Sequence, residues 1–246
     1  MRSLTCLGTS DAFGSAGRHC AGYLLDTGHG RILIDAGPGL LTALKALGRD
    51  TEQIDAVVLS HLHGDHFAGV PFLLLEYSYE SPRSRPLLVV GPPDTERRVY
   101  EAYHALYAET RGQKLPFEIR FVELGDGDAT EVMDARVESF RVPHQETQVS
   151  LGHRLRFGDR IVVYSGDTAW TPDLLRQSSG ADLFLCECST FDTQVPRHVR
   201  YVEIEANRRS FDCDRLVLTH LGREVRERSA EIGEELANDG LEIALG

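Results

Sequence analysis

Short apolar runs recur along the chain, and each is followed by residues that favour turns. These runs are a few residues long and rich in Val, Ile and Leu, which is typical of buried strands. They predict strands at Arg31–Asp35, Ala56–Leu59, Leu87–Val90, Val137–Val142, Ile161–Tyr164, Leu183–Cys186 and Leu216–Leu218. The chain is therefore expected to build its core largely from sheet.

Apolar positions between these runs recur at helical spacing. They predict helices at Leu40–Leu47, Phe67–Tyr77, roughly Thr95–Thr110 and Val225–Asn238, the last ended by Asp239-Gly240. Alternating strands and helices indicate an α/β chain. Since no repeat or long linker interrupts the 246 residues, we expect one domain over residues 1–246.

The composition narrows the function classes. Hydrophobic residues make up 41% and charged residues 26%, as in ordinary globular proteins. No apolar stretch approaches the roughly 20 residues of a membrane span and no signal-peptide core follows the amino terminus, so we expect a cytoplasmic protein without a membrane partner. A net charge of −12 argues against a broad nucleic-acid interface. Five cysteines without repeated CxxC spacing indicate reduced thiols, not a disulfide framework or cysteine zinc site.

The segment Ser60–His66 carries the strongest chemical signal. His61, His63, Asp65 and His66 follow directly after the strand Ala56–Leu59. Side chains two residues apart in an extended segment project to the same side, so His61 and His63 can bind one ion together. Asp65 and His66 are offset enough to reach a second ion. Imidazole and carboxylate ligands suit zinc, with manganese or iron as substitutes.

Two ions need more ligands than one loop supplies, and further strand ends offer them. His144 follows Val137–Val142, Asp167 follows Ile161–Tyr164, and His220 follows Leu216–Leu218. Open α/β sheets build their sites at the carboxyl ends of strands. We therefore expect these side chains to gather near the His61–His66 segment.

The order of these motifs resembles the metallo-β-lactamase superfamily, and most closely its ribonuclease Z-like branch. Besides the residues above, the resemblance rests on Leu7-Gly8-Thr9, on Asp11–Ser15 with Arg18, and on Ile34–Gly37. It spans nearly the whole chain. It implies a four-layer αβ/βα sandwich and a hydrolase with two metal ions.

The resemblance also implies the ligand sets. His61, His63 and His144 would hold one ion, Asp65, His66 and His220 the other, and Asp167 would bridge them. Asp35 is a candidate to orient a ligand histidine, with a buried structural acid as the alternative. Two adjacent ions lower the pKa of a shared water, so that a metal-bound hydroxide can attack the substrate. No nucleophilic side chain is then required, and no G-x-S-x-G segment is present.

Further catalytic and binding residues follow from the same resemblance. His198 occupies the place of a histidine that protonates the leaving oxygen in ribonuclease Z-like proteins, and Glu187 matches its acidic partner. Asp65 is assigned to catalysis as well as to metal binding. Arg154 and Arg18 are candidates to contact a phosphate. We interpret His19, His29, His104 and His153 as ordinary histidines without a catalytic role.

One departure from ribonuclease Z bears on the substrate. The transfer-RNA-binding arm is missing, because only residues 145–166 separate His144 from Asp167 and they look like two strands. We therefore expect a phosphodiesterase acting on a small phosphodiester such as a cyclic nucleotide or cyclic ribose phosphate, with a carboxyl hydrolase (lactonase or thioesterase) as the alternative. A ribonuclease Z-type RNA endonuclease and a non-catalytic metal-binding protein rank lower. The resemblance also suggests a homodimer.

Overall fold

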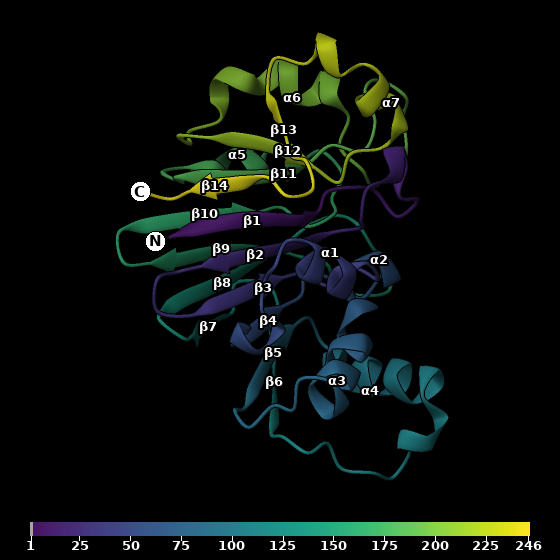
Figure 1. Cartoon of the computed structure of the whole chain (residues 1–246). Coiled ribbons are helices and arrows are strands. Elements are labelled where there is room, and N and C mark those ends of the chain that lie inside the picture. The colour runs from purple at the N-terminus through teal and green to yellow at the C-terminus, as the bar shows by residue number, and fades with distance from the viewer. Residues whose placement is uncertain (1) are drawn as a thin grey trace.

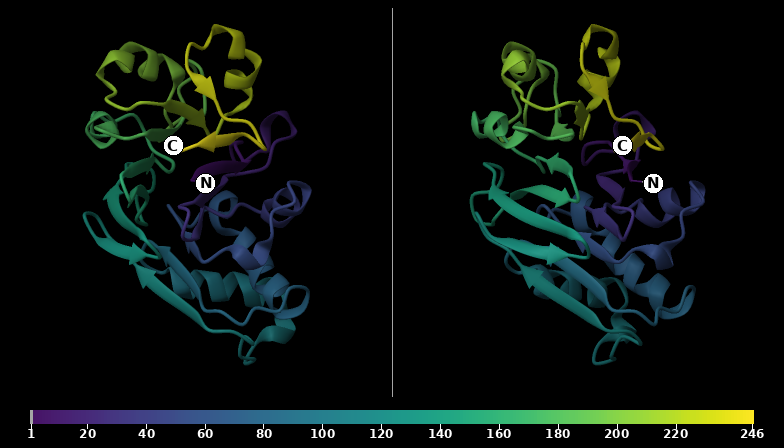
Figure 2. Two further views of the ribbon diagram at one scale, coloured as in Figure 1. Left: turned by 60° about the vertical axis from the view of Figure 1, so that its left-hand side comes forward. Right: turned by 90° about the vertical axis from the view of Figure 1, so that its left-hand side faces the viewer.

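The computed structural model describes residues 2–246, which form two mixed sheets packed face to face with helices outside both (Figures 1 and 2). The first sheet has the spatial order β14 (Glu242–Ala244), β1 (Ser3–Gly8), β2 (Gly22–Asp26), β3 (Arg31–Ile34), β4 (Ala56–Val58), β5 (Leu87–Gly91) and β6 (Ile119–Glu123). The second has the order β13 (Glu235–Leu236), β12 (Leu216–Thr219), β11 (Leu183–Glu187), β10 (Arg160–Tyr164), β9 (Leu151–Phe157), β8 (Ala135–Arg141) and β7 (Ala129–Val132).

Three hydrophobic cores lie between the four layers of the structure. The central core joins the inner faces of the two sheets, for example Ile34 and Val58 of the first with Val162 and Leu185 of the second. A second core joins the outer face of the first sheet to α1 (Leu40–Ala46), α3 (Gly69–Tyr79) and α4 (Thr95–Leu106). A third joins the second sheet to α5 (Asp173–Ser178), α6 (Tyr201–Asn207) and α7 (Arg223–Glu227). The predicted αβ/βα sandwich is confirmed.

Strand direction places the functional loops together. Strands β3 to β6 are parallel to one another, and so are β10 to β13. The segments that leave the carboxyl ends of β4, β10 and β12 contain the His61–His66 motif, Asp167 and His220. Each predicted strand is present to within two residues at its ends. The segment between His144 and Asp167 contains the hairpin β9–β10, as expected.

The helix predicted at Val225–Asn238 is wrong. Helix α7 ends at Glu227, a 3-10 turn covers Ser229–Glu231, and β13 follows. The reason is tertiary, because β13 pairs in parallel with β12 through Val217–Glu235 and Leu218–Leu236. Backbone groups that a helix would have satisfied locally are satisfied here by the neighbouring strand.

Two other helix boundaries differ from the prediction. The segment after the histidine motif forms α2 (Gly64–Phe67) before α3, so Asp65 and His66 already lie on a helical turn. The helix from Thr95 ends at Leu106, with a 3-10 turn at Ala108–Thr110.

All cysteines are free, and Cys6, Cys186 and Cys188 are buried. Within residues 2–246, no helix is long and apolar enough to cross a membrane.

Candidate metal centre and active-site pocket

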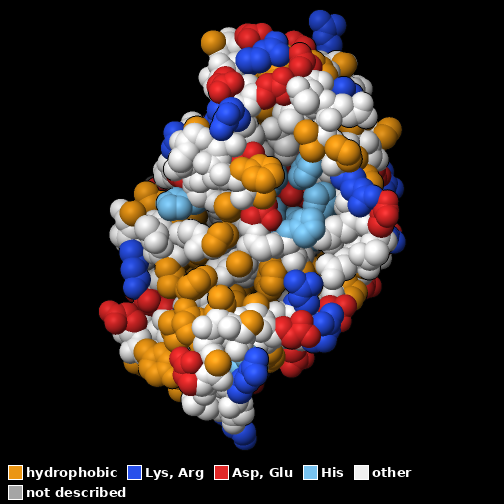
Figure 3. All heavy atoms as spheres, turned by 90° about the vertical axis from the view of Figure 1, so that its right-hand side faces the viewer, with side chains coloured by type: hydrophobic (Ala, Val, Ile, Leu, Met, Phe, Trp, Pro, Cys, Tyr) orange, Lys and Arg blue, Asp and Glu red, His pale blue; other side chains and the backbone are white. Residues whose placement is uncertain are grey.

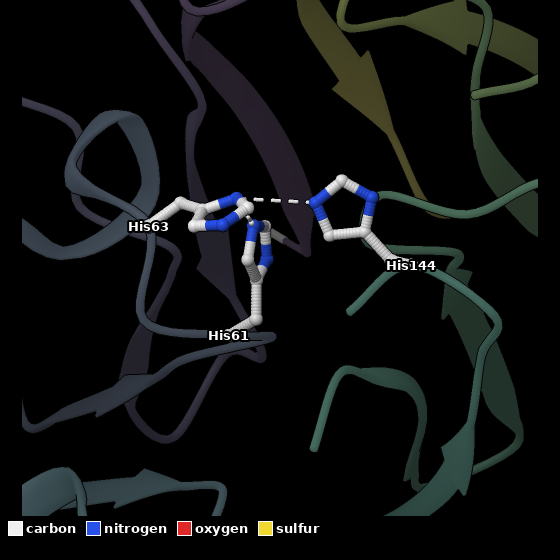
Figure 4. A group of neighbouring side chains, drawn as sticks. All are labelled: His61, His63 and His144. Atoms are coloured by element: carbon white, nitrogen blue, oxygen red, sulfur yellow. Dashed lines mark hydrogen bonds between the residues drawn. The ribbon is translucent and has the colours of Figure 1, made fainter. Parts of the chain in front are cut away.

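Three histidines from two separate segments point toward one another (Figure 4). Nε2 of His61 and Nε2 of His144 each lie 3.1 Å from Nδ1 of His63. His61 and His144 are buried, while His63 reaches the surface. Three ring nitrogens with lone pairs converging on one point form a donor set that suits a divalent cation.

A second group lies beside the first. Asp65, His66, Asp167 and His220 could hold a metal ion together. Asp167 is nearly fully buried and faces both groups: Oδ1 lies 3.2 Å from Nε2 of His66, and Oδ2 lies 3.3 Å from Nε2 of His220 and 3.8 Å from Nε2 of His144. The structure thus brings together all seven residues that the sequence analysis assigned to metal binding.

Buried polar atoms in this cluster lack hydrogen bonds. Nε2 of His66 and Oδ1 of Asp167 have no hydrogen-bond partner although they lie close together. Such orphaned atoms are costly in a protein interior unless another group binds them. A divalent cation satisfies a lone-pair nitrogen and a carboxylate oxygen at once, so the residues fit a metal centre.

Neighbouring groups fix the ring orientation and tautomer of two of these histidines. Asp35, fully buried, accepts a hydrogen bond from Nδ1 of His66 at 2.7 Å. Ser60 Oγ donates to Asp35 and lies 3.0 Å from Nδ1 of His61, so that nitrogen must carry the proton and donate to Ser60. In both rings the Nε2 lone pair is left free for a metal, as in carboxylate–histidine–metal arrangements.

Hydrogen bonds fix the tautomers of the other two buried histidines of the cluster, His144 and His220, in the same way. The carbonyl oxygen of Arg197 lies 3.2 Å from Nδ1 of His144 and accepts its proton. Ser189 Oγ donates to Glu187 at 2.9 Å and lies 3.0 Å from Nδ1 of His220, so it accepts from that ring. Nε2 is again the free nitrogen of both rings.

Electrostatics of the cluster also favour added positive charge. Burial lowers the pKa of His61 and His144, which keeps these rings neutral and able to donate a lone pair. Burial acts the same way on His66 and His220, but nearby carboxylates together outweigh it and raise the pKa of both: Asp167 with Asp35 at His66, and Asp167 with Asp65 and Glu187 at His220. The carboxylates that raise these two pKa values would attract a metal cation in the same way.

His198 stands next to the cluster with Glu187 behind it. Nδ1 of His198 lies 3.1 Å from Oε1 of Glu187, which is fully buried. The His198 ring stacks on His220, with centroids 5.5 Å apart and an angle of 5°. Burial opposes the charged form, yet the hydrogen bond and charge of Glu187 raise the pKa of His198 to about 9. The ring is thus held as a proton donor with Nε2 free.

The cluster forms the floor of a pocket of about 290 Å³. In Figure 3 histidine side chains gather in a hollow of the surface, with acidic, hydrophobic and basic side chains around them. The pocket is lined by Asp11, Ala12, Phe13, His63, Asp65, His144, Asp167, Ser189, Thr190, Val195, Pro196, His198 and His220. Its volume is near the lower end of the range for small-molecule sites, about 300–1,000 Å³.

The two arginines proposed as phosphate contacts lie elsewhere. The guanidinium of Arg154 donates to the carbonyl oxygens of Gln177 and Ser179, both at 2.8 Å, because its strand directs it to the α5 side. Arg18 lines a separate pocket with Arg226. Neither lines the pocket of the histidine cluster, so the structure does not bring them together with the other site residues, and a phosphate contact stays a prediction.

Sequence reasoning missed the supporting residues Ser60, Tyr164 and Ser189. Tyr164 OH donates to Asp35 at 2.8 Å, beside the bonds from Ser60 and His66. Only adjacency to the motif could have signalled Ser60, and nothing in the pattern singles out the other two. His153, which we left without a catalytic role, is buried and bonded to Ser139 and to the carbonyl oxygen of Leu59.

Comparisons with known proteins bear on the family and the fold. A family model described as "Anti-Pycsar protein Apyc1" matches residues 2–236. A protein of Agathobacter rectalis named ribonuclease Z is 32% identical over 76% of this chain and 75% of its own. The human short-form tRNase Z has a similar structure, with a TM-score of 0.81 and 23% identity over 99% of both chains. A diphosphatase from the PhnP family has a TM-score of 0.79 and 20% identity over 100% of this chain and 98% of its own.

Proposed function

The chain belongs to the family described as anti-Pycsar protein Apyc1, within the ribonuclease Z-like branch of the metallo-β-lactamase superfamily, and on this premise we propose that it hydrolyses a small, cyclic phosphodiester. It is a metal-dependent hydrolase of the metallo-β-lactamase fold, with clustered histidines and aspartates that suit divalent metals. The number and identity of the ions, the residue roles and the substrate are parts of our proposal.

Two divalent ions, with zinc as the preferred metal, would use the two groups of ligands. His61 Nε2, His63 Nδ1 and His144 Nε2 would hold one ion, and Asp65, His66 and His220 the other, with Asp167 between them. When bound, such ions supply hydroxide at neutral pH and neutralise charge that develops on the attacked phosphate. Everything else in the reaction falls to the side chains of the pocket.

Two side chains of the pocket transfer protons: Asp65 accepts one and His198 donates one. Asp65 lines the pocket beside the cluster, where its carboxylate can accept the proton that the attacking water loses. His198 donates a proton from Nε2 to the leaving oxygen, because its Nδ1 is taken up by Glu187 and Ser189. The pairing of His198 with Glu187 in the same pocket as the cluster is the observation that carries the proposal.

The pocket supports a small substrate. None of the described residues that line the pocket is Lys or Arg, so the pocket offers no row of positive charges to bind a nucleic-acid backbone. The connection between His144 and Asp167 is used by the hairpin β9–β10 and a short loop, which leaves no room for a long arm. A second candidate, processing of transfer-RNA precursors, is favoured only by the names of the relatives.

The experiment compares three substrates with zinc- or manganese-loaded protein. We expect hydrolysis of a cyclic nucleotide at a kcat/KM at least about tenfold above that for an acyl ester or a lactone. Asp167→Ala should abolish this activity. Higher kcat/KM on the acyl substrate would replace the phosphodiesterase proposal with the carboxyl hydrolase.

A further inference from the structure

Phe13 is the most exposed large hydrophobic residue of the described chain. Its side chain is 91% exposed, although it belongs to the loop between β1 and β2 that borders the cluster. An isolated exposed apolar residue needs no explanation, but this one also lines the active-site pocket. Its position raises the question of what the ring contacts when substrate is bound.

The loop holds Phe13 in a defined place. Asp11, almost buried, accepts hydrogen bonds from the backbone N–H groups of Phe13 and Ser15, both at 3.2 Å. It also accepts from the hydroxyls of Ser10 and Ser15, both at 2.9 Å. A carboxylate that organises a loop in this way removes much of the entropy that the loop would lose on binding a ligand. The backbone of Phe13 is therefore fixed before substrate arrives.

The floor and the rim of the pocket differ in chemistry. Histidines and carboxylates occupy the floor, whereas Ala12, Phe13, Val195 and Pro196 supply an apolar rim from two loops. A phosphodiester that reacts at the floor must direct its remaining part toward this rim. The rim has an aromatic face, and none of the residues that line the pocket is Lys or Arg, so the rim suits a planar, weakly polar ring better than a second phosphate.

From this arrangement we propose that Phe13 is a specificity-determining residue, a stacking platform for the base of a cyclic nucleotide whose phosphate lies over the cluster. The inference rests on the proposed phosphodiesterase activity and deepens it by assigning one residue of the rim to the base of the substrate. Stacking accepts any base, because every base has a π face. The platform therefore provides affinity for nucleotides without choosing among bases by hydrogen bonds.

The test uses matched ligands with and without a base. Hydrolysis is measured for a cyclic nucleotide and for the cyclic ribose phosphate that lacks the base. Calorimetric binding to metal-loaded protein is measured for a nucleoside monophosphate and for ribose 5-phosphate, so that one readout does not depend on turnover. The variants are Phe13→Ala and Phe13→Trp, with Tyr79→Ala as the control because Tyr79 is 66% exposed and does not line this pocket.

Phe13→Ala should raise the KM for the cyclic nucleotide and the Kd for the monophosphate by about 5- to 150-fold, as for other base-stacking aromatics. Both ribose ligands should change less than about twofold, and Phe13→Trp should retain wild-type values. Equal losses with and without the base, no loss at all, or a change only in oligomeric mass would overturn the proposal. If wild type hydrolyses no diester, the proposed function fails, and the monophosphate binding still decides the role of Phe13.

Discussion

The carboxylate of Asp35 lies 2.7 Å from Nδ1 of His66, and both side chains are fully buried. The same carboxylate accepts hydrogen bonds from the hydroxyls of Ser60 and Tyr164. Asp35 adopts a left-handed backbone conformation with φ of 53°. Such a conformation costs energy in residues other than glycine and persists where the surroundings enforce it. One carboxylate thus ties the end of β3 to the histidine motif after β4.

This contact gives the first prediction. Asp35→Asn should weaken metal binding by about 10- to 100-fold, because an amide cannot accept all of these hydrogen bonds and no longer fixes the His66 ring. Competition with a chromophoric chelator measures the affinity. Asp159→Asn is the control, since Asp159 is 72% exposed in the turn between β9 and β10. Equal metal retention in both variants would show that Asp35 is only a structural acid.

The second prediction concerns stoichiometry. Protein reconstituted with zinc should contain about two ions per chain, since the donor atoms form two groups that share Asp167. Asp167→Ala should lower this number sharply, and elemental analysis measures it. A wild-type value at or below one after reconstitution would contradict the binuclear centre.

The third prediction separates proton donation from metal chemistry. His198→Ala should lower kcat on an alkyl diester by about 10²–10⁴-fold, the usual contribution of a general acid, and leave the metal content unchanged. The loss should shrink on a nitrophenyl diester, because nitrophenolate leaves with little need of a proton. His29→Ala is the control, as His29 is exposed and does not line the pocket. An equal loss on both diesters would make His198 a positioning residue instead.

The fourth prediction is that transfer-RNA precursors are poor substrates. A net charge of −12 and a pocket lining without Lys or Arg disfavour a polyanionic backbone. Trimming of a precursor at physiological salt should be at least about 100-fold slower than hydrolysis of a cyclic nucleotide at equal concentration, measured by gel analysis of the product ends. Comparable rates would favour RNA processing as the activity.

The fifth prediction concerns the packing that supports Asp35 and His66. A Cβ on Gly69 would lie 2.3 Å from the carbonyl oxygen of Gly37, so Gly69→Ala must displace backbone. We expect a loss of about 1–3 kcal/mol in the free energy of unfolding, the usual cost of overpacking. Denaturant titration measures it. Gly64→Ala is the matched control, because a Cβ there meets nothing within 4 Å, and it should be neutral or slightly stabilising.

The resemblance of the sequence to the metallo-β-lactamase superfamily implied the sandwich, and the strand pattern predicted which residues gather in the cluster. This was possible because His61, His144, Asp167 and His220 each follow a predicted strand, and strand ends of an open α/β sheet converge. Ligand type, spacing and position relative to an apolar run are local properties. Hydrophobic periodicity likewise placed β4, β10 and β12, since their side chains are buried whatever lies beside them.

Only the tertiary structure decided what depends on neighbours from distant parts of the chain. Strand β13 exists because β12 lies beside it, and Arg154 points to α5 and not to the cluster. The hydrogen bonds that set the histidine tautomers run from Tyr164 to Asp35 and from Ser189 to His220, across segments that no local pattern connects. Hydrophobicity would place Phe13 in the core, but the Asp11 turn holds its ring outside, at the rim of the pocket. Side-chain direction at a site is set by packing and hydrogen bonding in three dimensions, and the order of residues does not encode it locally.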